Sequence, residues 1–131
     1  MVGKKKQKLE KLLTEVELEL MNLIWELGHC NVKDVQTKLP EGRDLAYTSV
    51  ATIMKILEQK GALTSQKQEK AHIYTPSVSR VDYEKMSLKH LTENVFRGDP
   101  TQMVMRLLDE SHLNKTELEK IRAILEKGAK P

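Results

Sequence analysis

Helix-start signals recur along this chain and constrain its fold more than any other feature of the sequence. Each signal is a short polar side chain that can accept a hydrogen bond from the backbone N–H groups of a first helical turn. They stand at Thr14, Asn31, Ser79, Asp99 and Asn114. Apolar residues at helical spacing follow each of them. The sequence therefore predicts a mainly α-helical chain.

One stretch in the middle of the chain breaks the helical pattern. Before it, the sequence predicts three helices over residues 14–28, 31–39 and about 46–60. Residues 63–68 and 71–75 instead carry Thr, Ile and Tyr at extended spacing, which predicts a short two-stranded β-hairpin. Three helices followed by a hairpin is the element order of a winged helix-turn-helix.

Three further helices are predicted in the rest of the chain, each with an apolar stripe. Helices this short bury little surface by themselves, so the module needs a partner. The simplest partner is the same module of a second chain in a two-fold dimer. The side chains expected to fill that interface are Leu88, Leu91, Val95, Met103, Leu107, Leu118, Ile121 and Leu125. The expected organisation is a basic tail (1–12), a winged-helix domain (13–77) and a helical dimerisation domain (78–131).

The predicted third helix has an apolar side and a side of short polar residues. The residues that follow the helical repeat and are expected in the core are Val50, Ile53, Met54 and Leu57. Short side chains on the opposite face let a helix enter the major groove of DNA and reach the base edges. The expected DNA contacts are Thr48, Ser49, Ala51, Thr52 and Lys55 on this helix, with Lys67 and Lys70 in the hairpin. The alternative is a winged helix that binds another protein without sequence-specific DNA binding.

Positive charge is concentrated at the amino end. The whole chain has a formal net charge of +3, yet the predicted tail contains a cluster of lysines with Glu10 as its acid. These lysines are Lys4, Lys5, Lys6, Lys8 and Lys11. Such a tail either meets a polyanion such as DNA or is a solvated appendage.

Composition argues against several other classes of protein. A single cysteine, Cys30, excludes a disulfide framework and a multi-cysteine zinc site, so it is interpreted as a small buried thiol beside a loop histidine, His29. The sequence has no glycine-rich phosphate loop and no nucleophile elbow, so no enzyme activity, cofactor, metal or small-molecule substrate is expected. No apolar run approaches the roughly 20 residues of a membrane span. A cytoplasmic, nucleoid-associated protein is expected.

Several motifs together resemble one family of bacterial repressors. They are Leu13-Thr14-Glu15-x-Glu17 with Met21-x-x-x-Trp25, Ala46-Tyr47-Thr48-Ser49-Val50-x-Thr52, Leu57-Glu58-x-Lys60-Gly61-x-Leu63, Tyr74-x-Pro76, and Leu107-Leu108 followed by Leu113-x-x-x-Glu117-Leu118. The sequence is similar to the BlaI/MecI/CopY repressors, often called penicillinase repressors. The resemblance implies a winged-helix domain, a helical dimerisation domain, and repression by a homodimer at a palindromic operator in double-stranded DNA.

The sequence also departs from this family at informative positions. Ile56 stands where family members commonly have Arg, and Glu69-Lys70-Ala71 stands where their hairpin turn usually has Gly-Arg. Penicillinase repressors are inactivated by cleavage of an Asn-Phe bond, but Arg106-Leu107 occupies the aligned position. Copper-responsive members carry paired Cys-x-Cys motifs, which a chain with one cysteine lacks. Neither of these two release mechanisms is therefore expected.

Overall fold

The computed structural model describes residues 9–110 and 112–128 of the 131-residue chain. It consists of two compact units, one ending at Ser87 and the other beginning at Leu88. The sequence placed this boundary ten residues earlier, after residue 77. Among the described residues, no helix has the length and apolar character that crossing a membrane requires.

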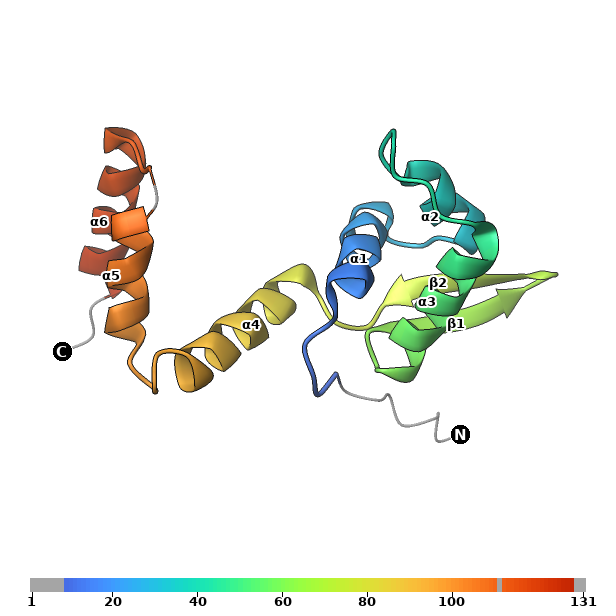
Figure 1. The fold of residues 1–131 in the computed structure, drawn as a ribbon, viewed down its shortest axis with the longest axis horizontal. Coiled ribbons are helices and arrows are strands. Elements are labelled where there is room, and N and C mark those ends of the chain that lie inside the picture. Colours follow the sequence, from blue (N-terminus) through green and yellow to red (C-terminus); the bar gives the residue numbers. More distant parts are fainter. Residues whose placement is uncertain (1–8, 111, 129–131) are drawn as a thin grey trace. The chain divides into compact units, whose positions relative to one another are not determined.

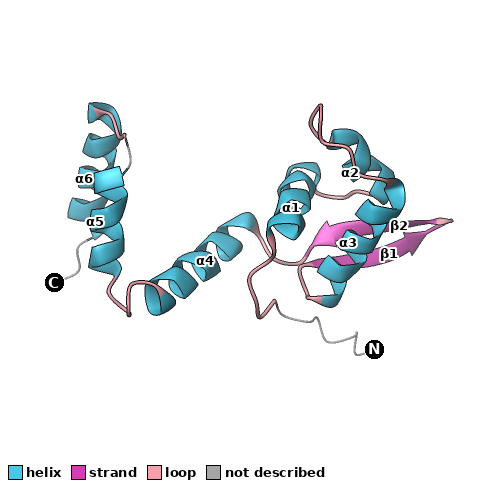
Figure 2. Cartoon of the chain, in the orientation of Figure 1, coloured by secondary structure: helices cyan, strands magenta, loops and turns pink. Residues whose placement is uncertain are grey.

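The first unit is a winged helix-turn-helix, as the sequence predicts. Its helices α1 (Glu15–Leu27), α2 (Val32–Lys38) and α3 (Tyr47–Gln59) precede strands β1 (Leu63–Gln68) and β2 (Ala71–Pro76). In Figure 1 the ribbon of α3 crosses in front of the two strands, and Figure 2 shows the same elements coloured by type. The predicted mainly helical fold with one small hairpin is confirmed.

Local capping fixes where the first two helices begin. The Thr14 hydroxyl accepts a hydrogen bond from the Glu17 N–H, and the Glu17 carboxylate accepts one from the Thr14 N–H. Asn31 and Asp34 form the same reciprocal pair at the start of α2. By contrast, α3 begins at Ala46 without any side-chain cap and without an acidic residue in its first turn. The first-turn N–H groups of α3 are thus left for an outside acceptor.

A short segment at Cys30 pairs with strand β2 of the hairpin. β1 and β2 pair antiparallel, from Leu63 opposite Pro76 to Gln68 opposite Ala71. Cys30, between α1 and α2, exchanges two backbone hydrogen bonds with Tyr74 at 3.0 and 2.7 Å. This pairing attaches the start of α2 to the sheet, and the sequence did not predict it.

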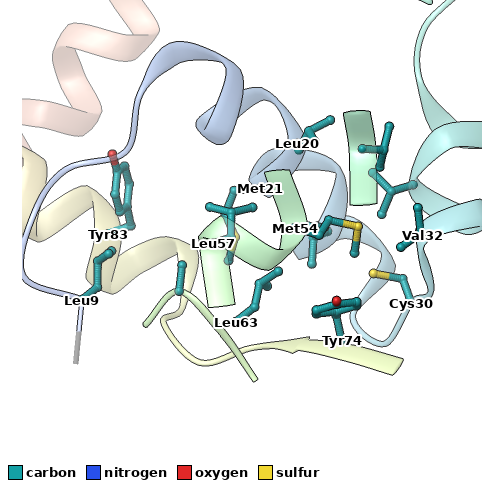
Figure 3. Packing of buried hydrophobic residues seen from close by; sticks show 14 residues of the cluster. Leu9, Leu20, Met21, Cys30, Val32, Met54, Leu57, Leu63, Tyr74 and Tyr83 are labelled. Carbon is teal, nitrogen blue, oxygen red and sulfur yellow. The ribbon is translucent and has the colours of Figure 1, made fainter. Parts of the chain in front are cut away.

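The core lies between the three helices and one face of the hairpin (Figure 3). Its fully buried side chains are Leu20, Met21, Ile24, Cys30, Val35, Val50, Met54, Leu57 and Leu63. The prediction of a buried thiol at Cys30 is confirmed. Burial raises the pKa of this thiol to about 11, with a smaller contribution from the nearby charge of Asp34. Cys30 is therefore a packed core residue that stays protonated at neutral pH.

The first unit includes residues on both sides of the predicted winged-helix domain. Leu9, which belongs to the predicted tail, is buried. The backbone N–H of Leu13 donates to the hydroxyl of Tyr83 in α4 (Arg80–Asn94) at 2.9 Å. The Trp25 ring lies 5.7 Å from that of Tyr83. These contacts hold the start of α4 against α1, which explains why the unit extends to Ser87. The tail lysines Lys4, Lys5, Lys6 and Lys8 lie outside the described residues.

The second unit contains the end of α4 together with α5 (Pro100–Glu110) and α6 (Lys115–Gly128). The predicted helix-start residues Asp99 and Asn114 cap α5 and α6, and Asn114 exchanges hydrogen bonds with Glu117. No described side chain from Leu88 onward is buried. Large apolar side chains are instead exposed, namely Leu88, Leu91, Val95, Val104, Met105, Leu107, Leu108, Leu118, Ile124 and Leu125. The described part of this unit therefore leaves many large apolar side chains in contact with solvent.

Glu17→Gln is expected to destabilise the first unit in a pH-dependent way. Lys60 Nζ contacts both carboxylate oxygens of Glu17 at 2.7 and 2.8 Å. Burial alone would raise the pKa of Glu17, but the hydrogen bonds from Lys60 and the Thr14 N–H outweigh it and hold this pKa below its ordinary value. The stabilisation is thus fully present above the ordinary pKa of about 4.3 and is lost as pH falls through the lower folded-state value.

The expected loss at pH 7 is about 1–3 kcal/mol in the free energy of unfolding, because Lys60 is partly exposed and water limits the effect. Urea denaturation followed by Trp25 fluorescence at pH 7 and pH 3 measures it. Glu19→Gln is the matched control. Glu19 binds Arg43 with both carboxylate oxygens but lies in a more exposed pair, so its loss should stay below about 1 kcal/mol. An equal loss for both variants, or a Glu17→Gln loss that persists at pH 3, would contradict this account.

Glu69→Gly is expected to stabilise the hairpin. Glu69 occupies the turn between β1 and β2 with φ of 55°, a conformation that costs an L-residue about 1 kcal/mol and glycine almost nothing. Glu69→Gln removes the charge but keeps the strain, so it is the control. Thermal unfolding should therefore show the Gly variant to be more stable than the Gln variant. Identical stabilities would show that the turn carries no such strain.

Candidate nucleic-acid interface

α3 exposes a stripe of short side chains because its other side is held in the core. Val50, Met54 and Leu57 have no exposed surface. Since a helix turns once every 3.6 residues, Thr48, Thr52 and Lys55 must then point away from the core. All three are exposed in the structure, as is Ser49 at one edge of the stripe.

Ala51 lies differently from its neighbours. It is half-buried and packs against the core. The sequence grouped it with the open face because it is small, but the helical repeat puts it between the two sides. Gln59, which the sequence did not single out, is exposed one turn beyond Lys55 and extends the stripe. Helical spacing from Thr48 would have identified it.

The Thr52 hydroxyl is engaged within α3. It donates a hydrogen bond to the backbone carbonyl of Thr48 at 2.8 Å. A hydroxyl has one proton, so the Thr52 oxygen can only accept from a further partner. Thr52 therefore offers an outside molecule an acceptor and a methyl group, while Thr48 and Ser49 can both donate and accept.

Two ion pairs and one amide hold the ends of α3. At its C-terminal end, Lys60 binds the buried carboxylate of Glu17 in α1. Before its first turn, Arg43 binds Glu19 at 2.8 and 3.0 Å, and the Gln36 side chain donates to the Leu45 carbonyl at 3.1 Å. The Arg43 guanidinium also lowers the pKa of Glu19 by hydrogen bonding, so this pair is charged at neutral pH. The exposed stripe thus sits on a helix that is fixed at both ends.

The hairpin is attached to α3 and carries two exposed lysines. The Ser65 hydroxyl donates to the Glu58 carboxylate, and the Ser77 hydroxyl donates to the Gly61 carbonyl at 2.6 Å. Lys67, opposite His72 in β2, and Lys70, in the turn, are both exposed. The predicted contact residues therefore occur in two groups, one on α3 and one on the hairpin.

Other features of the first unit do not form a chemical centre. A groove of about 600 Å³ beside the hairpin is lined by His29, Asp34, Gln66 and neighbouring side chains. His29 Nδ1 lies 2.9 Å from the Thr75 hydroxyl. In the part of the chain that the structure describes, no three His, Cys, Asp or Glu side chains are grouped so that they could hold a metal ion.

The residues predicted to form a dimer are available for contact in the second unit. Met103 and Ile121 are half-buried, and the other six are exposed. Val104, Met105, Leu108 and Ile124 are exposed as well and enlarge the apolar surface beyond the predicted set.

Comparisons with known proteins agree with this geometry. A family model described as penicillinase repressor matches residues 13–127. The chain is 26% identical to the penicillinase repressor of Bacillus licheniformis, over 87% of this chain and 89% of that protein. It is 24% identical to the methicillin resistance regulatory protein MecI of Mammaliicoccus sciuri, over 88% and 94%.

A solved structure is similar to the first unit. The DNA-binding domain of the repressor BlaI shares 28% sequence identity with this chain and superposes with a TM-score of 0.51. The match covers 59% of this chain and 93% of that domain. Because the family model spans the winged helix and the helices that follow it, the chain belongs to the penicillinase repressor family of transcriptional repressors.

Proposed function

We propose that this protein is a homodimeric repressor that binds a palindromic operator, placing α3 of each protomer in the major groove. One observation carries the proposal: a fixed helix presents short polar side chains outward along one stripe. A bulky or acidic face would keep the helix backbone away from the base edges, whereas Thr and Ser let it approach. The BlaI domain that resembles the first unit is itself described as DNA-binding.

The roles of the α3 side chains follow from their donor and acceptor groups. Thr48 and Ser49 can donate to base edges or phosphates and accept from them. Thr52 can accept from a base amino group or place its methyl group against a thymine methyl. The ammonium group of Lys55 can contact a phosphate. The methyl group of half-buried Ala51 lies at the border of the stripe. The contacts to base edges select the DNA sequence, whereas the contacts to phosphates fix the position of the protein on the DNA.

The hairpin lysines contact phosphates of the DNA backbone in this proposal. Lys67 and Lys70 are exposed on an element that extends beside α3 (Figure 1). Between Leu9 and Ser87, acidic side chains slightly outnumber basic ones. In this proposal the positive charge that meets the DNA comes from these two lysines and Lys55. We expect binding to weaken with salt, since each neutralised phosphate releases counterions.

The second unit ties two protomers together. With no buried side chain among its described residues, it gains a core only by packing against another apolar surface. A second copy presents the same apolar surface, so a two-fold interface buries the apolar surfaces of both copies. Leu88, Leu91, Val95 and Met103 with Leu107, Leu118, Ile121 and Leu125 form its centre in this proposal. Two linked half-site contacts then bind far more tightly than one.

We assign the protein no catalytic role, no cofactor and no small-molecule substrate, because operator binding accounts for the exposed stripe without chemistry. Its place of action is then the cytoplasm, at the bacterial nucleoid. Selection of bound fragments from random duplex DNA tests the proposal. Recovery of one sequence in two inverted copies is the expected result. Failure to retain any duplex at low salt would instead favour a winged helix that binds a protein partner.

Thr52→Val is expected to change sequence preference without unfolding the protein. The variant keeps two methyl-sized groups but removes the oxygen acceptor, so discrimination at the base pair that Thr52 reads should fall by about 1–3 kcal/mol. Competition between the selected duplex and single-base variants measures this. Thr116→Val in α6 is the matched control, because that exposed threonine lies in the second unit. An unchanged preference for every base pair would show that the Thr52 oxygen reads no base.

Leu125→Glu is expected to dissociate the dimer. A charge at an apolar interface must be desolvated without a partner, which costs several kcal/mol. Sedimentation should therefore show a monomer, with operator affinity reduced and binding to an isolated half-site retained. Thr116→Glu adds the same charge at an exposed polar position and should remain dimeric. A Leu125→Glu dimer of undiminished stability would place the interface elsewhere.

A further inference from the structure

Tyr47 is an exposed aromatic side chain in the first turn of α3. It is 51% exposed, whereas the other two tyrosines of the chain, Tyr74 and Tyr83, are 7% and 6% exposed. Aromatic residues are scarce in this protein, at 4% of the sequence. Tyrosine joins an apolar ring to a hydrogen-bonding hydroxyl, and for this reason it is enriched at binding surfaces.

The open stripe of α3 has one edge that faces the hairpin, and Tyr47 lies on that edge. Tyr47, Ala51 and Glu58 follow one another on a line along α3, four and seven residues apart. Glu58 on this line binds Ser65 of β1. Burial chiefly raises the pKa of Tyr74 in β2, and the nearby Glu58 and Tyr47 raise it further, so Tyr47 lies near Tyr74 as well. The ring is therefore at the border between α3 and the hairpin.

This border is where a DNA strand passes if α3 occupies the major groove and the hairpin follows the adjoining backbone. We propose that Tyr47 contacts that strand, with its ring against a deoxyribose and its hydroxyl donating to a phosphate. The inference rests on the proposed operator binding. It adds Tyr47 to the DNA-contacting residues, as an uncharged contact to the sugar and phosphate of one strand. Tyrosine is among the side chains that donate to phosphate oxygens in protein–DNA complexes.

A tyrosine contact differs from a lysine contact in its response to salt. Tyr47 is neutral, so it displaces no counterion, whereas each lysine that neutralises a phosphate contributes about −0.9 to the slope of log affinity against log salt. Tyr47→Phe should weaken binding to the selected duplex about tenfold, the effect of one hydrogen bond to a charged acceptor, and leave the salt slope unchanged. Tyr47→Ala should weaken it more, about thirtyfold. Lys55→Met is the comparison variant, since its loss should make the slope shallower by about 0.9.

Nitration of tyrosine by tetranitromethane tests the contact on the chain without any substitution. In the free protein Tyr47 should react while the buried Tyr74 and Tyr83 are spared, as peptide mapping by mass spectrometry will show. The selected duplex should protect Tyr47. A Tyr47 that is unreactive in the free protein is covered by another surface, and that result would overturn the inference.

The outcomes separate this inference from the proposed function. If the protein retains the selected duplex, but Tyr47 stays equally reactive in the complex, the Tyr47 contact is wrong and operator binding stands. Protection of Tyr47 with unreduced affinity of Tyr47→Ala would also overturn the contact. If no duplex is retained at all, the proposed function and this inference fail together. Thermal unfolding of both variants close to that of the wild type confirms that lost affinity does not come from a lost fold.

Discussion

The burial of one side of α3 is the constraint on which the rest of the structure depends. Val50, Met54 and Leu57 are completely buried, and each contributes about 1.5–3 kcal/mol of transfer free energy. Rotating α3 about its axis would expose them at a cost of several kcal/mol. The core therefore determines which side chains of α3 face outward, and the ion pairs of Lys60 with Glu17 and of Arg43 with Glu19 keep the helix from sliding.

Much of the fold could be predicted because its signals are local. The capping residues Thr14, Asn31 and Asn114 lie three residues from their partners, so both members of each pair are visible in one short stretch of sequence. The two sides of α3 follow from the helical repeat alone. The hairpin formed although its turn has no glycine, and Glu69 adopts the positive φ that the turn requires.

The remaining features depend on contacts between distant parts of the chain. The pairing of Cys30 with Tyr74 and the bond between Leu13 and Tyr83 join residues that no short pattern connects. Because these contacts are long-range, the sequence pattern predicts Leu9 in the tail and a first unit that ends before α4. The exposure of Tyr47 follows from packing and not from residue type. Ala51 is a different case, because the helical repeat already places it between the two sides of α3 and only its small size favoured the open face.

The central claim is that the outward side of α3 lies against the bases of duplex DNA. Methyl NMR of the full-length protein, with and without the selected duplex, observes this directly. The account predicts large shifts of the Thr48 and Thr52 methyl signals on binding, while Thr116 in α6 stays unchanged. Tight binding that leaves the Thr48 and Thr52 signals in place would contradict it.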